Sequence, residues 1–247
     1  MSTTTIRGTV RGTAERANPA FAAAVVAVPP LALAYALTLG SVRTHTYVHV
    51  MAGVLWTGID LFMGLVLGPV LGGLGEEPRA AVFQRFTPKM TFLMPSLAVV
   101  TIVGGITLAT RVGAFPHAGP WTALTSTAMV VPGLLLIGRQ FRAFRDRRWL
   151  AVAALAGVGH AAWLVDTLPE FAMTAPEIVA ALVVAALLSV IGFGVLLPGE
   201  VRMYLEMVSD DPDAGLIGRI GMRNARLAAV QGALQLVIVL VMVHIRY

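Results

Sequence analysis

The chain has no cysteine and few charged side chains. Without cysteine among its 247 residues, it forms no disulfide, iron–sulfur cluster, thiolate zinc site or cysteine nucleophile. Charged residues make up only 13% of the chain, about half the share found in an ordinary soluble domain. Hydrophobic residues make up 57%, and they lie in runs of about 20 residues, the length that crosses a bilayer. The composition therefore predicts an integral membrane protein whose surroundings are the lipid bilayer.

The apolar runs predict an all-α, polytopic transmembrane helix bundle of about seven helices, read as a single membrane domain over residues 1–247. Residues 1–18 are expected to form a polar cytoplasmic N-terminus without a signal peptide, because no short apolar core with a cleavage site follows them. Residues 198–226 are expected to form a cytoplasmic connection, either a helix along the membrane surface or a docking site for a partner. The expected spans are 19–41, 46–72, 90–111, 121–138, 149–166, 178–197 and 227–246.

The basic residues predict the orientation of these spans. Most of the 18 lysines and arginines fall on the side of the N-terminus, and only Arg43, Arg111 and Arg246 fall on the other side. Because short loops rich in lysine and arginine stay in the cytoplasm, we expect the N-terminus inside and the C-terminus outside. The same loops account for the net charge of +5, so no nucleic-acid partner is predicted. The expected location is the cytoplasmic membrane of a bacterium or an archaeon.

All five histidines fall toward the expected outer side: His45, His49, His117, His160 and His244. Histidine is the commonest metal ligand, and ionisable groups inside a membrane usually face the interior of the bundle. His49 and His160 are expected at similar depth on different helices, as a b-type haem with two axial histidines requires. His45 and His49 share one helix face and can instead hold a metal ion. Simple placement at the membrane interface is the alternative for His45, His117 and His244.

Asp60 is the one carboxylate expected near the middle of a span. It follows His49 by close to three helical turns, so both side chains share a face with Trp56, about 16 Å apart along the axis. A lone ionised carboxylate inside a membrane is costly, so Asp60 is expected to be protonated or paired. Two uses stay open: a proton relay from the histidines toward the cytoplasm, and a structural hydrogen bond to Thr101 or Thr107.

A family resemblance begins with His49, Trp56 and Gly58 and continues, after a basic loop, with MPSLAVVTIVGGITLA at residues 94–109. This pattern resembles a bacterial membrane superfamily that groups CopD-type copper-resistance proteins with HemJ-type protoporphyrinogen oxidases. The similarity covers mainly residues 45–111 and loosely the last helix. It implies that His49 matches the leading histidine of the family, which is associated with haem in the HemJ type and with copper movement in the CopD type.

The chain also departs from both types. GPVLGG stands where the HemJ type has a proline–arginine motif, and seven spans exceed that compact fold, which argues against protoporphyrinogen oxidase activity. No methionine-rich outer face is present, which argues against copper import.

Our leading hypothesis is a haem b protein with its cofactor near the outer face. It would pass electrons to or from a quinone or a redox partner subunit. His49 and His160 are the expected axial ligands, with His244 or His45 as substitutes. Trp56 is expected beside the macrocycle, and Asp60 is the expected proton carrier.

Two alternatives come from different classes of protein. A copper-handling membrane protein would draw its ligands from His45, His49 and His160, with His117 or His244 in support. A non-catalytic subunit would contribute helices to a larger homo- or hetero-oligomeric membrane complex. The sequence favours neither an enzyme nor a protein without catalytic activity.

Overall fold

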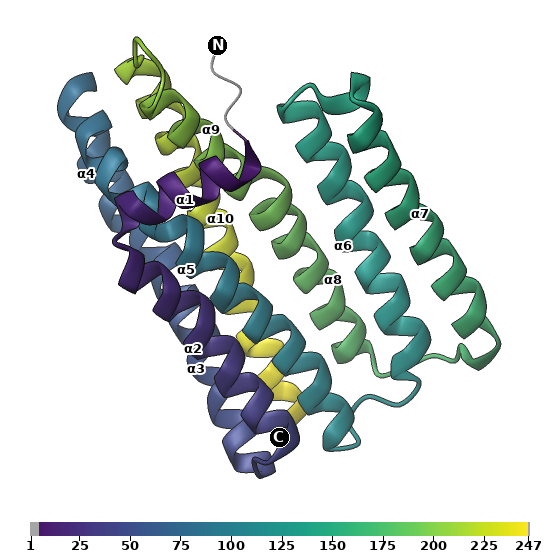
Figure 1. Cartoon of the computed structure of the whole chain (residues 1–247). Coiled ribbons are helices and arrows are strands. Elements are labelled where there is room, and N and C mark those ends of the chain that lie inside the picture. The colour runs from purple at the N-terminus through teal and green to yellow at the C-terminus, as the bar shows by residue number, and fades with distance from the viewer. Residues whose placement is uncertain (1–4, 247) are drawn as a thin grey trace. The chain divides into compact units, whose positions relative to one another are not determined.

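The computed structural model describes residues 5–246, and within that range every regular element is helical. Seven of these helices are long and apolar enough to cross a membrane, which confirms the expected all-α membrane fold. The chain is therefore a multi-pass membrane protein (Figure 1). The seven candidate spans are Pro19–Thr38, Val42–Gly72, Glu76–Arg111, Ala118–Gln140, Arg147–Glu170, Pro176–Met207 and Ala214–His244.

The chain divides into two compact units, and the division falls inside three of the candidate spans. The first unit is Met1–Thr101 with Leu196–Gly232, and the second is Ile102–Val195 with Ala233–Tyr247. The first holds α1 (Ile6–Ala17), α2 (Pro19–Thr38), α3 (Val42–Leu61), η1 (Phe62–Leu67), α4 (Gly68–Gly72), most of α5 (Glu76–Arg111), α9 (Leu197–Met207) and the first part of α10 (Ala214–Arg246). The second holds α6 (Ala118–Gln140), η2 (Ala143–Arg145), α7 (Arg147–Thr167), η3 (Leu168–Glu170), α8 (Pro176–Ile191) and most of η4 (Gly192–Leu196).

The expected polar N-terminus forms a helix, α1, from Ile6 to Ala17. Residues 1–4 of that expected segment lie outside the described residues. The Thr5 hydroxyl caps the helix by accepting a hydrogen bond from the backbone N–H of Gly8 at 3.1 Å. Asn18, with a φ of 78°, ends α1, and its side chain accepts from the N–H of Ala20 to start α2. α1 contacts both α2 and α9 and lies across the direction of α2 (Figure 1).

Most of the region 198–226 is helical. α9 continues directly from η4 to Met207, and α10 begins at Ala214, so only residues 208–213 connect the two helices. The Glu206 carboxylate accepts from the N–H of Asp213 at 3.0 Å, and Asp213 accepts from the N–H of Leu216 at 2.9 Å. These bonds close the turn and cap α10. The amphipathic segments therefore continue two of the seven candidate spans, and the cytoplasmic placement of residues 198–226 stays a prediction.

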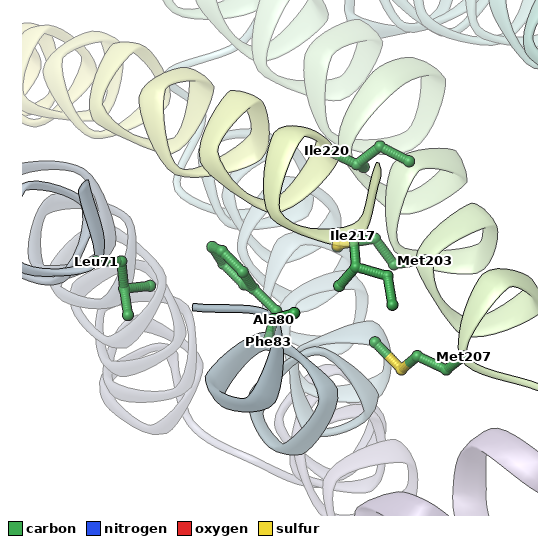
Figure 2. Close-up of a cluster of buried hydrophobic side chains, with 7 residues drawn as sticks. All are labelled: Leu71, Ala80, Phe83, Met203, Met207, Ile217 and Ile220. Atoms are coloured by element: carbon green, nitrogen blue, oxygen red, sulfur yellow. The ribbon is translucent and has the colours of Figure 1, made fainter. Parts of the chain in front are cut away.

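A buried apolar cluster explains why these amphipathic segments pair with each other. Burying apolar side chains between helices removes them from water, which stabilises the folded chain by about 25 cal/mol per Å² of apolar surface. α9 and α10 supply four of its side chains at helical spacing, and α4 and α5 supply the rest (Figure 2). The cluster consists of Leu71, Ala80, Phe83, Met203, Met207, Ile217 and Ile220.

α3 with its extension and α10 run antiparallel at very close approach. An added Cβ at Gly64 would lie 2.3 Å from the Cβ of Ala229, and one at Gly232 would lie 2.7 Å from Cδ2 of Leu61. Residue numbers rise along one helix as they fall along the other, which gives the antiparallel register. Small residues let membrane helices approach this closely and gain dispersion energy without a hydrophobic driving force.

The second unit is built around α6, which contacts α7 and α8. Trp121 on α6 is buried beside Ile178 and Leu182 of α8, and its indole N–H donates to the carbonyl of Ala172 at 3.0 Å. In contrast, α7 has no buried residue, so most of its surface is available to lipid.

Candidate functional site

His49 stands on α3 with one ring nitrogen bonded to a neighbouring helix. Ser41 caps α3 by accepting from the N–H of Thr44 at 3.2 Å, which fixes where the helix begins. Nδ1 of His49 lies 2.9 Å from the backbone carbonyl oxygen of Thr101 on α5. Because a carbonyl only accepts, Nδ1 carries the hydrogen and donates it. Within the described part of the chain Nε2 makes no hydrogen bond, so its lone pair is available.

The buried face of α3 continues from His49 toward the middle of the span. His45 is 0% exposed and interacts electrostatically with His49 one turn away. Trp56 and Asp60 are also buried on this helix. The structure thus places four of the predicted site residues, His45, His49, Trp56 and Asp60, on one helix of the first unit.

His160 uses both of its ring nitrogens within the second unit. Nδ1 donates to the carbonyl of Ala156 at 2.8 Å, one turn earlier on α7. Nε2 lies 3.1 Å from Oγ of Ser126 on α6, and in the neutral ring it accepts from that hydroxyl. His160 therefore ties α7 to α6. Since His49 belongs to the other unit, the pairing of these two histidines as haem ligands stays a prediction.

The remaining histidines, also in the second unit, are exposed. His117 lies just before α6 with a φ of 55°, and His244 lies 3.9 Å from the Glu177 carboxylate with its own side chain 77% exposed. In the described range, no three histidine, aspartate or glutamate side chains gather closely enough to hold a metal ion. The copper alternative stays a prediction.

A second carboxyl group, which the sequence reasoning missed, lies near Asp60. Glu200 on α9 interacts electrostatically with Asp60 and shares a side-chain hydrogen bond with Thr91 on α5. Asp60 is only 2% exposed, and Glu200 is partly buried. Three helices of the first unit therefore contribute side chains to this polar cluster.

Both carboxyl groups stand next to a widened helical turn. The π-helical stretch η1 (Phe62–Leu67) begins two residues after Asp60, and η4 (Gly192–Leu196) ends four residues before Glu200. Such stretches are rare and often occur at functional sites. The carboxyl pair is therefore a second candidate site, distinct from the histidines at the start of α3.

The sequence held one signal that would have revealed Glu200. Met203, Tyr204 and Met207 recur at helical spacing and are all buried, a pattern that predicts a continued helix. Reading α8 onward through this pattern places Glu200 on a membrane helix instead of in a solvated loop. Comparisons with family models, curated proteins and solved structures found no match to this chain.

Proposed function

We propose that this chain binds haem b through His49 and carries electrons within the membrane. The observation that supports this proposal is the hydrogen bond from Nδ1 of His49 to the Thr101 carbonyl at 2.9 Å. A ligand histidine typically donates its second ring N–H to a carbonyl or carboxylate, which fixes the tautomer and the ring orientation. His49 has this arrangement, and Nε2 is left to serve as the ligand atom.

The residues present fit one axial position better than two. His49 is oriented by a hydrogen bond and partly buried, as an axial ligand requires. For His160 to ligate iron, Nε2 would have to give up the Ser126 hydroxyl. A bound haem would supply a one-electron carrier, and a quinone or a redox subunit is the proposed electron partner. The chain's own contribution is to hold the imidazole in one tautomer between α3 and α5.

The test of this proposal is the optical spectrum of the purified full-length protein. Spectra are recorded after oxidation and after reduction by dithionite, and a pyridine haemochrome assay identifies the haem type. Reduced-minus-oxidised bands of b-type haem at near one haem per chain would support the proposal. A colourless protein from cells supplied with haem precursors would overturn it.

We also propose that Asp60 and Glu200 hold a proton inside the membrane. The side chain of Thr91 has a single hydroxyl hydrogen, so it can donate only one hydrogen bond. That hydroxyl donates to the carbonyl of Thr87 at 3.0 Å, so it has no hydrogen left for an ionised Glu200. A protonated Glu200 donates to the Thr91 oxygen instead, so the Thr91 hydroxyl then both donates and accepts. Protonation also avoids two adjacent ionised carboxylates in a medium of low dielectric constant.

Glu200→Gln is expected to remove the infrared C=O stretch of a protonated carboxylic acid. The wild-type protein should show this band at neutral pH, because one of the two carboxyl groups keeps its proton. Glu77→Gln, an exposed position on α5, is the matched control and should leave the band unchanged. A wild-type spectrum without the band, or a band that survives in Glu200→Gln, would contradict protonation at Glu200.

A further inference from the structure

Two arginines meet at the end of the first unit that lies opposite His49. Arg202 on α9 and Arg223 on α10 are each partly buried. Arg223 lies against Gly199 of α9, which is three residues before Arg202 and therefore on the same side of that helix, and the two guanidinium groups interact electrostatically. In the residues that the structure describes, neither arginine forms an ion pair with a carboxylate. Two cations held together without a counter-charge raise the free energy of the folded chain, so the arrangement is suited to an anion.

Arg223 also has an unused donor that is already buried. Its Nε is buried and has no hydrogen-bond partner in the described part of the chain. A buried donor without a partner costs about 1–3 kcal/mol, and more when it is charged. The same guanidinium donates through Nη2 to Oδ1 of Asn224 at 3.2 Å, and Asn224 in turn donates to the carbonyl of Leu196 at 3.1 Å. These bonds hold the guanidinium in place while Nε stays without a hydrogen-bond partner in the described residues.

The backbone of α9 leaves room for the guanidinium group of Arg223. A Cβ added at Gly199 would lie 2.7 Å from Nη2 of Arg223, so the glycine lets the guanidinium lie directly against α9. Met203 and Ile220, near the two arginines in sequence, are buried in the apolar cluster of Figure 2. The two helices that carry the arginines are therefore fixed to each other by packing.

The position of the two arginines along their helices also indicates which ligand they bind. Ala225 faces Gly68, so Arg223 is level with the last residues of α4, about 30 Å along the helix axis from His49. The site is thus separate from the proposed haem site. Arg202 lies toward the end of one candidate span and Arg223 toward the start of the next, and the ends of spans are where membrane proteins meet the phosphates of lipid headgroups.

We propose that Arg202 and Arg223 together bind a phosphate group, carried by an anionic phospholipid or present as free phosphate. Guanidinium groups bind phosphate through paired, charge-assisted hydrogen bonds, and basic pockets between membrane helices recognise lipid headgroups in this way. The bound phosphate accepts from the buried Nε of Arg223 and removes the repulsion between the two cations.

The experiment measures thermal unfolding of the full chain in a neutral detergent. Phosphatidylglycerol, phosphatidylcholine and inorganic phosphate are titrated separately into the wild type, Arg202→Gln, Arg223→Gln and Arg226→Gln. Arg226 is an exposed arginine on α10, the helix that also carries Arg223, and it serves as the matched control. We expect a ligand-dependent rise in Tm for the wild type and Arg226→Gln. Arg202→Gln and Arg223→Gln should need at least about tenfold more ligand for the same rise.

The arms of the titration separate the two sources of phosphate. A rise with phosphatidylglycerol and none with inorganic phosphate assigns the site to lipid, and a rise with both assigns it to the phosphate group itself. Without ligand, Arg202→Gln should be at least as stable as the wild type, because the repulsion is gone. The proposal is overturned if phosphatidylcholine acts as well as phosphatidylglycerol, or if Arg202→Gln responds to the anionic ligands like the wild type.

Discussion

Replacing His49 with alanine is expected to leave a folded protein that no longer retains haem. The substitution removes Nε2, the ring nitrogen that has no hydrogen bond in the described structure, together with the Nδ1 donor to Thr101. Loss of an outer partner of a ligand histidine already lowers affinity by about 10–100-fold, so loss of the ligand itself should cost at least as much. The measurement is the haem-to-protein ratio after purification, obtained from the pyridine haemochrome assay.

Two further histidine variants give this experiment its controls. His117→Ala changes an exposed position outside the proposed site and should retain haem at the wild-type ratio. His160→Ala removes the bond to Ser126 that links α6 with α7. It therefore distinguishes a structural role of His160 from a role as a haem ligand. Full haem occupancy in His49→Ala would rule out His49 as the ligand.

Gly64→Ala is expected to prevent stable folding of the first unit. The new methyl group would lie 2.3 Å from the Cβ and 2.5 Å from the Cα of Ala229. Backbone atoms cannot turn aside as a flexible side chain can, so α10 would have to move away from η1. Overpacking of a core typically costs about 1–3 kcal/mol, and contact with backbone places this substitution at or above the upper end. The measurements are the yield of monodisperse protein and the midpoint of unfolding in a denaturing detergent.

Gly58→Ala provides the matched control on the same membrane span. No atom lies within 4 Å of a Cβ added at Gly58, so alanine meets no obstacle there. Alanine is favoured over glycine in a helix by about 1 kcal/mol, and the variant should be as stable as the wild type or more so. Equal behaviour of the Gly64 and Gly58 variants would show that the close approach of α3 and α10 is not required.

Much of the fold follows from local patterns in the sequence. Apolar runs long enough to span a bilayer are visible without knowledge of the neighbours, and each expected span overlaps one of the seven candidate spans of the structure. The burial of Asp60 follows in the same way, since it shares the spacing of Trp56 and the histidines on one helix. These features depend only on residues within a few turns of each other.

The parts that the sequence did not predict depend on contacts between distant helices. Glu200 becomes notable only because α3 brings Asp60 near it and α5 brings Thr91. The Thr101 carbonyl that orients His49, and the Ser126 hydroxyl that engages His160, belong to other helices as well. Helical periodicity gives the face on which a residue lies, but it gives no information about which helix covers that face.

The π-helical stretch Phe62–Leu67 affects each comparison between a position before it and a position after it on the same span. A widened turn holds an additional residue, so side chains beyond it are rotated by about 100° relative to a regular helix with 3.6 residues per turn. A helical wheel drawn through Val42–Gly72 would therefore assign Leu71 to the wrong sector. This one membrane span directs His49 toward α5 at one end and Leu71 into the cluster of α5, α9 and α10 at the other, with the phase shift between them.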